Sequence, residues 1–268
     1  MLIASWSDSH QVGTTTNLLS LATAVPLVYE QLNAIIFHAN KERSSLESFM
    51  ESYIKAEDAI SSGVAELENL FHSGILRPEH LNTHVRRILE GKLYVLEGRN
   101  IGASQIFDSF LPILLELLSQ RYKLAFVDVP TGLGKKAAHD ILTKADVVVV
   151  NLTQNEEVLR HFFTSLPTYS PLQGKELFYC IGNYEENSHN TMRKISKAYN
   201  ISSSNIGVVP RNVKLLDSCN SGTVPDFILK AMAVTTKDWS YDDDKHFADH
   251  LKSTVSSLVK LTGIPIIK

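Results

Sequence analysis

Short apolar runs alternate along the chain with longer amphipathic stretches. Runs that are apolar throughout and bounded by polar residues or glycine predict strands at residues 2–5, 34–37, 93–96, 124–127, 147–151, 177–181 and 206–209. Such strands are typical of a sheet that is covered on both faces. Helical spacing follows at residues 15–30, 104–120, 135–144, 156–165 and 191–199. The alternation predicts an α/β fold, with a doubly wound, mostly parallel sheet between two helical layers.

The chain contains no internal repeat and no long linker-like stretch, so we expect one domain over residues 1–268. Residues 44–84 are rich in Glu, Ser and Leu at helical spacing. They predict two or three helices inserted after the second strand, within a region of about 44–90. Residues 242–261 predict a C-terminal helix whose apolar stripe packs on the core.

Composition and charge exclude several classes of protein. With 44% hydrophobic and 21% charged residues, the chain is typical of a globular protein rather than a fibrous or disordered one. The formal net charge of -3 provides no overall positive field for nucleic acid, so DNA is not an expected partner. Three small basic clusters are interpreted as solvated helix faces: Arg86 with Arg87, Lys135 with Lys136, and Arg193 with Lys194 and Lys197.

The N-terminal residues lack the basic segment and the long apolar core of a signal peptide. No run approaches the roughly 18 apolar residues of a membrane span, so any membrane contact is expected to be peripheral. The two cysteines have no metal-ligand spacing and imply no disulfide framework. We therefore expect a cytoplasmic protein. The ten histidines are scattered, and none has the spacing with Glu of a zinc-protease helix.

The candidate chemistry lies in the first loop, where a predicted strand is followed by a turn and by a helix that starts Gly13-Thr14-Thr15-Thr16. Unpaired N–H groups at the start of a helix bind anions, and Gly13 lets the backbone approach them closely. A working phosphate loop requires Gly-Lys-Ser or Gly-Lys-Thr. Here Thr14 occupies the position of the lysine.

Residues 9–16 resemble the deviant phosphate loop of the ParA/MinD family, whose pattern is Lys-Gly-Gly-Val-Gly-Lys-Thr-Thr. Four later segments resemble family segments in the family's order: residues 122–132, 145–150, 178–183 and 206–212. The resemblance covers most of residues 1–230 and is faintest in the region of the inserted helices. It implies a P-loop NTPase fold of the ParA/MinD type.

The resemblance also implies a site for ATP or ADP with Mg²⁺. Backbone amides of the first loop would hold the phosphates, Thr15 and Asp128 would hold Mg²⁺, and Gly132 would face the γ-phosphate. Asn183 and Pro210 would lie against the adenine. The expected nucleotide-binding residues are thus Gly13, Thr14, Thr15, Thr16, Asp128, Gly132, Asn183 and Pro210.

The chain departs from the family pattern at charged positions. Ser9 and Thr14 replace the two family lysines, and His38 and Asn40 stand where the family has an Asp-x-Asp that positions the attacking water. Asn40 can orient a water but cannot accept a proton. We interpret His38 as a structural histidine rather than a base. Because phosphoryl transfer needs positive charge on the phosphates, we expect inefficient ATP hydrolysis.

The leading hypothesis is therefore a non-hydrolysing or very slow ATPase that acts as a scaffold or localisation factor. Its machine would be one for pilus assembly, secretion, conjugation or partition, and it would act with a protein partner or as a homodimer. Residues 91–98 look similar to a segment that is frequent in MinD and in the TadZ/CpaE branch, which serves pilus assembly and polar localisation. Two alternatives stay open: a slow ATP-dependent dimerisation switch, with His10 or a second subunit supplying charge, and a DNA-binding partition protein.

Overall fold

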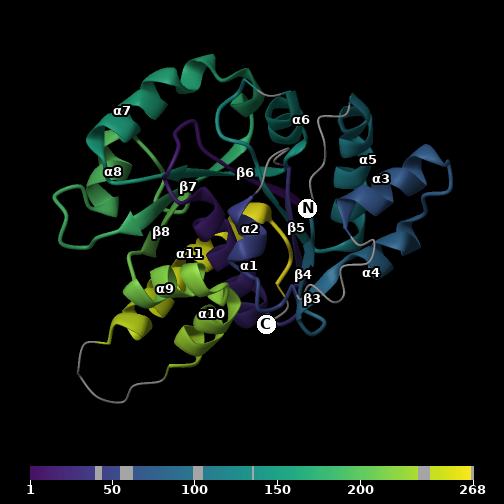
Figure 1. Ribbon diagram of the computed structural model, residues 1–268. Coiled ribbons are helices and arrows are strands. Elements are labelled where there is room, and N and C mark those ends of the chain that lie inside the picture. Colours follow the sequence, from purple (N-terminus) through teal and green to yellow (C-terminus); the bar gives the residue numbers. More distant parts are fainter. Residues whose placement is uncertain (40–43, 55–62, 99–104, 135, 235–241, 267–268) are drawn as a thin grey trace.

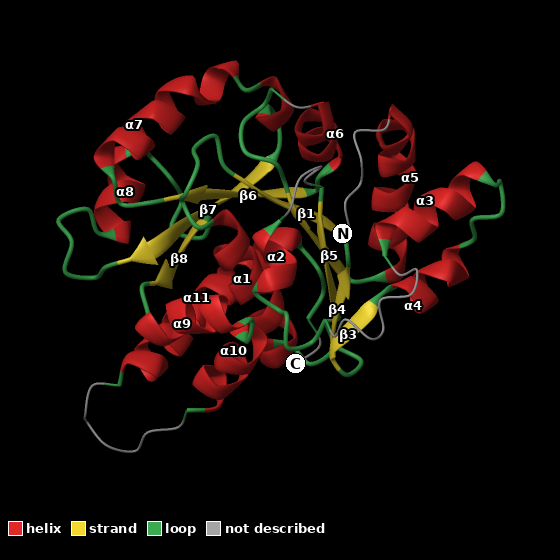
Figure 2. Cartoon of the chain, viewed as in Figure 1, coloured by secondary structure: helices red, strands yellow, loops and turns green. Residues whose placement is uncertain are grey.

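The computed structural model describes residues 1–39, 44–54, 63–98, 105–134, 136–234 and 242–266. Within these residues the strands form one sheet in the order β3-β4-β2-β5-β1-β6-β7-β8, and neighbours are parallel except for β3 and β4 (Figures 1 and 2). The strands are β1 (Leu2–Trp6), β2 (Ala34–His38), β3 (Arg86–Leu89), β4 (Leu93–Leu96), β5 (Leu124–Asp128), β6 (Val147–Leu152), β7 (Glu176–Tyr184) and β8 (Ile206–Pro210).

Helices connect the strands and cover both faces of the sheet (Figure 2). They are α1 (Thr14–Val28), α2 (Ser45–Ser48), α3 (Val64–His72), α4 (Leu81–His84), α5 (Gln105–Arg121), α6 (Lys136–Lys144), α7 (Glu156–Ser165), α8 (Met192–Ala198), α9 (Val213–Ser221), α10 (Val224–Ala233) and α11 (Asp243–Thr262). The predicted helix at 104–120 begins with a residue, Ser104, that lies outside the described part of the chain, as does Lys135.

Side chains alternate along each strand and so divide the core into two layers. In β1, Leu2, Ala4 and Trp6 pack with α3, α5, α6 and α7, whereas Ile3 packs with α1, α10 and α11 on the opposite face. Because both faces are covered, the central strands β1, β2, β5 and β6 are apolar over most of their length, which is the pattern seen in the sequence. The predicted fold class is confirmed.

One edge of the sheet differs from the expectation. Arg86 and Arg87, interpreted as a solvated helix face, lie instead on β3, which pairs antiparallel with β4. The Arg86 guanidinium forms an ion pair with the buried Glu97 carboxylate, and Ile88 of β3 is buried in the core layer that contains α1, α10 and α11. Two adjacent arginines hid this strand, because charge on an edge strand breaks the apolar pattern that marks the others.

The C-terminal helix α11 lies along β8 and against α1 and α10. Its apolar stripe is buried in the second core layer, including Phe247, Leu251, Val255 and Leu258. The region between β2 and β4 contains α2, α3 and α4, as the helical spacing indicated. In the described part of the chain, each helix is too short or too polar to cross a membrane.

Candidate functional site

The loop between β1 and α1 ends in a helix start that suits an anion. Gly13 caps α1 with a left-handed φ of 82°, and the first turn of this 15-residue helix contains no acidic side chain. Thr14, Thr15 and Thr16 are half-buried in that turn. The first N–H groups of a helix have no partner within it and carry its positive dipole end, so they attract negative charge. The structure thus brings the predicted phosphate-binding amides together at one helix end.

The hydroxyl of Thr15 meets the carboxylate of Asp128 beneath this loop. The Thr15 hydroxyl donates a hydrogen bond to Asp128 Oδ2 over 2.8 Å. Asp128 ends β5, and its register partners are Ser5 on β1 and His38 on β2, so it sits at the carboxyl edge of the sheet. This hydroxyl and carboxylate are hard oxygen donors of the kind that Mg²⁺ prefers, and they fit the expected ion.

Burial destabilises the charged form of the Asp128 carboxylate. It is 2% exposed. Burial raises the pKa of Asp128 to about 6, while the hydrogen bond from Thr15 and the charge of His38 lower it and the charge of Glu47 raises it. At neutral pH the group is therefore mostly ionised, although the surroundings favour its protonated form.

A buried amide network fixes α1 under the loop, and the sequence did not predict it. Asn17 Nδ2 donates to Asn151 Oδ1 over 3.0 Å, and Asn151 Nδ2 donates to Ser5 Oγ over 2.9 Å. Gly182 on β7 approaches so closely that a Cβ there would stand 2.5 Å from Asn17 Nδ2. These contacts tie the first turn of α1 to β1, β6 and β7. They fix the start of α1 beneath the loop.

Ser9, at the first lysine position of the family, forms a hydrogen bond within the loop. Its hydroxyl donates to Asp8 Oδ1 over 2.9 Å, and Asp8 Oδ2 accepts a 2.8 Å hydrogen bond from the Tyr169 hydroxyl. Burial, together with the hydrogen bond and charge of Asp8, raises the pKa of Tyr169 to about 12. His10 and Gln11 are exposed at the tip of the loop. Gln11 has a left-handed φ of 60°, a conformation that favours glycine, and the family has glycine there.

His38 forms a pair with Glu47 beside Asp128. His38 is buried at the end of β2, and its Nε2 lies 2.6 Å from Glu47 Oε1, which also accepts a 3.1 Å hydrogen bond from the Gly98 amide. Burial raises the pKa of Glu47, but the hydrogen bond and charge of His38 and the Gly98 amide together outweigh burial, so the pKa is lowered. Asn40 lies outside the described residues.

Sequence reasoning missed Glu47. The only signal was the Ser44-x-x-Glu47 spacing of a capping box, in which Glu47 would turn back to its own helix start. Ser44 does cap α2, with its hydroxyl oxygen accepting from the Leu46 amide. The Glu47 carboxylate turns instead towards His38 and Gly98.

The remaining predicted residues lie apart from Thr15 and Asp128. The Gly132 amide, expected to face a γ-phosphate, donates to the Ser7 carbonyl over 3.1 Å, so in this structure it joins the segment after β5 to the segment after β1. Asn183 is exposed at an irregularity in β7, with a left-handed φ of 48°. Pro210 ends β8 and lines a cleft of about 410 Å³ together with Tyr184. Since β6 and β7 separate β1 from β8, this cleft is some three strand spacings from the loop, on the order of 14 Å.

Comparisons with known proteins address the fold. No family model matches the sequence, and the search of curated proteins gave no match. Solved structures do match over nearly the whole chain. A ParA family ATPase from Chlorobium tepidum has a TM-score of 0.71 at 15% identity, covering 96% of this chain and 98% of its own.

Two MinD structures are similar to the same extent. MinD from Pyrococcus horikoshii complexed with Mg-ADP has a TM-score of 0.69 at 14% identity, with 98% of this chain and 97% of that chain covered. The MinC:MinD cell division complex from Aquifex aeolicus gives 0.68 at 15% identity, with 100% and 98% covered. The chain therefore has the ParA/MinD-type P-loop NTPase fold, and the resemblance found in the sequence is confirmed at the level of fold.

Proposed function

We propose that this protein binds ATP or ADP with Mg²⁺, hydrolyses ATP slowly or not at all, and works in the cytoplasm as a scaffold or localisation factor of a larger machine. One observation carries the proposal. The Thr15 hydroxyl and the Asp128 carboxylate meet at 2.8 Å under an intact anion-binding helix start, whereas Ser9 and Thr14 stand where the resemblance places lysines. The groups that would bind Mg²⁺ and the phosphates are present, whereas the positive charge of the two lysines is absent.

The residues present support the proposed nucleotide binding and the proposed slow turnover. Amides of Gly13, Thr14, Thr15 and Thr16 would bind the phosphates, and Thr15 with Asp128 would hold Mg²⁺, which supplies charge neutralisation. No lysine at Ser9 or Thr14 adds to that charge, and losing a transition-state cation of this kind reduces the rate by about 10³ to 10⁵. The base would lie in the cleft at Pro210, beside Asn183.

The proposed partner is another protein or a second copy of this chain. The Aquifex MinD structure is a MinC:MinD complex, which supports a protein partner for this fold. Residues 91–98 are similar to a segment found both in the TadZ/CpaE branch and in MinD, and the proposed machine is one for pilus assembly, secretion, conjugation or partition. DNA is not included, because the net charge is -3 and the basic groups of α8 form only a small cluster.

A second candidate function is a slow ATP-dependent dimerisation switch. It is favoured by the His38–Glu47 pair, which places an oriented imidazole next to Asp128, where the resemblance expects the water-positioning carboxylates. Under this alternative ATP should shift the protein from monomer to dimer, and Asp128→Ala should abolish the shift. If sedimentation experiments show the same oligomeric state with and without ATP, the switch is excluded.

Calorimetric titration with ATP and a slowly hydrolysed analogue, with and without Mg²⁺, tests the main proposal. We expect Mg²⁺-dependent binding that Thr15→Val weakens at least tenfold, because the hydroxyl is lost and the shape is kept. Thr143→Val, which removes a hydroxyl from the exposed end of α6, is the matched control and should leave binding unchanged. ATP turnover at the rate of a normal phosphate loop, or no binding at millimolar nucleotide, would overturn the proposal.

A further inference from the structure

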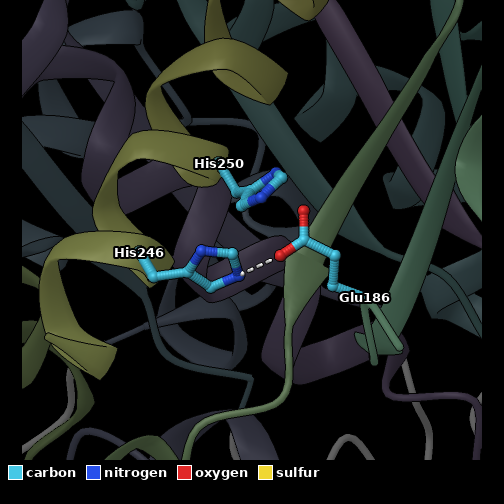
Figure 3. Close-up of side chains that lie close together, drawn as sticks. All are labelled: Glu186, His246 and His250. Atoms are coloured by element: carbon cyan, nitrogen blue, oxygen red, sulfur yellow. Dashed lines mark ion pairs between the residues drawn. The ribbon is translucent and has the colours of Figure 1, made fainter. Parts of the chain in front are cut away.

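Two histidines and a glutamate converge on the outer side of α11, away from the Thr15–Asp128 pair. His246 and His250 are one helical turn apart on α11, and their rings meet edge to face with centroids 4.5 Å apart. Glu186, in the segment after β7, places its Oε2 3.7 Å from His246 Nε2 (Figure 3). One ligand atom from each of the three residues lies within 4.8 Å of the other two.

The spacing of these groups suits a small divalent ion. Metal–nitrogen bonds of about 2.0–2.1 Å in a tetrahedral site separate neighbouring ligand atoms by about 3.3 Å. The contact between Glu186 and His246 is already close to that value at 3.7 Å. His246 and His250 are only half-buried and Glu186 is exposed, so small side-chain rotations can close the remaining gap without moving the backbone.

The electrostatic surroundings favour a cation. Among the described residues, three carboxylates, those of Glu185, Glu186 and Asp243, line the cleft against the one guanidinium of Arg211. Carboxylates on several sides raise the local concentration of cations.

We propose that Glu186, His246 and His250 form a binding site for a divalent transition-metal ion of the Zn²⁺ class, with a fourth position open to water. Two imidazoles and one carboxylate favour Zn²⁺, Co²⁺ or Ni²⁺ over Mg²⁺ and Ca²⁺, which bind oxygen ligands. Three protein ligands leave the coordination sphere incomplete, which distinguishes this set from a closed structural zinc site.

The position of the site gives the ion a mechanical effect. Glu186 and His246 line the same cleft as Pro210 and Asn212. A metal held by all three ligands would join the segment after β7 to α11, which packs along β8. The bound ion would therefore restrain one wall of the cleft and add positive charge there, next to the place proposed for the adenine base.

The test is a titration of the full chain, free of any polyhistidine tag, with Zn²⁺ and no nucleotide. We expect one ion per chain, with Co²⁺ giving the visible absorption of a tetrahedral site. His246→Ala and His250→Ala should each lower the affinity at least about tenfold, since even loss of an outer partner of a ligand costs that much. Glu186→Gln should also weaken binding. His139→Ala removes an exposed histidine of α6 and is the matched control.

Each variant is first checked by circular dichroism and thermal unfolding, and the exposed Glu186→Gln substitution provides a test that does not depend on the helix. Zinc binding that is absent, or that is equal in the wild type and in a His246→Ala/His250→Ala double variant, would overturn the site. Because the titration contains no nucleotide, this failure would leave the proposed nucleotide binding at Thr15 and Asp128 untouched, and the converse also holds.

Discussion

Replacing Asp128 by asparagine is expected to stabilise the folded protein at neutral pH while it weakens nucleotide binding. Burial raises the pKa of this carboxyl from 3.8 to about 6, against the hydrogen bond from Thr15. Asparagine has the same shape and keeps an oxygen that accepts the Thr15 hydroxyl. The substitution therefore removes the buried charge and changes little else in the packing.

The size and sign of the effect follow from the two pKa values. A pKa that is higher in the folded than in the unfolded state means that the protonated carboxyl favours folding. This contribution is fully present below about pH 4 and is lost as the pH rises through about 6. A rise in pKa from 3.8 to about 6 corresponds to roughly 3 kcal/mol. Asp128→Asn should thus raise the free energy of unfolding by up to about 3 kcal/mol at pH 7 and by almost nothing at pH 4.

Urea unfolding of both proteins between pH 4 and 8 measures this difference. Asp217→Asn makes the same chemical change at an exposed position of α9 and controls for the loss of one negative charge. Calorimetry on the same samples should show that Asp128→Asn weakens Mg²⁺-dependent nucleotide binding. A stability difference that stays constant over this pH range, or a variant that is less stable at pH 7, would refute the reasoning.

Three further substitutions test the loop and its support. Thr14→Lys should tighten ATP binding at least tenfold in calorimetry, because a charge-assisted hydrogen bond contributes about 1.5–3 kcal/mol; unchanged affinity would contradict the assignment of the loop. Gln11→Gly should raise the free energy of unfolding by roughly 0.5–1 kcal/mol, because glycine adopts a φ of 60° without strain; a lower free energy in urea unfolding would count against this. Gly182→Ala should lower the free energy of unfolding by roughly 1–3 kcal/mol, because the new Cβ would stand 2.5 Å from Asn17 Nδ2. Gly134→Ala has open space around it and should leave the thermal stability unchanged.

The fold could be predicted because its signal is local and repeated. Each buried parallel strand is an apolar run of its own, and each amphipathic stretch between the runs is a helix, so the alternation by itself defines the sheet. Strand β3 was not predicted, because its own residues do not form an apolar run and it is held by its pairing with β4. Arg86 forms an ion pair with Glu97, which follows β4, and two adjacent arginines do not resemble a strand until that pairing is known.

The candidate site could be predicted only as far as it lies on one continuous motif. Thr15 and Asp128 were paired through family order, and the structure brings them to 2.8 Å. Glu47, Asn17 and Asn151 were missed, because their partners come from other strands and only folding makes them neighbours. The same reason hid the convergence of Glu186 with the two histidines of α11.

The cost of keeping Asp128 charged is itself an argument for a ligand. A buried carboxylate that loses roughly 3 kcal/mol at pH 7 is a poor choice for stability alone, since asparagine would keep the Thr15 hydrogen bond. A ligand that binds only the folded state returns about 2.7 kcal/mol at a concentration of 100 Kd. A bound cation beside Asp128 would also lower its pKa, so the free energy lost in the empty protein would be regained on binding. Mg²⁺-nucleotide should therefore raise the thermal stability of the wild type by more than it raises that of Asp128→Asn.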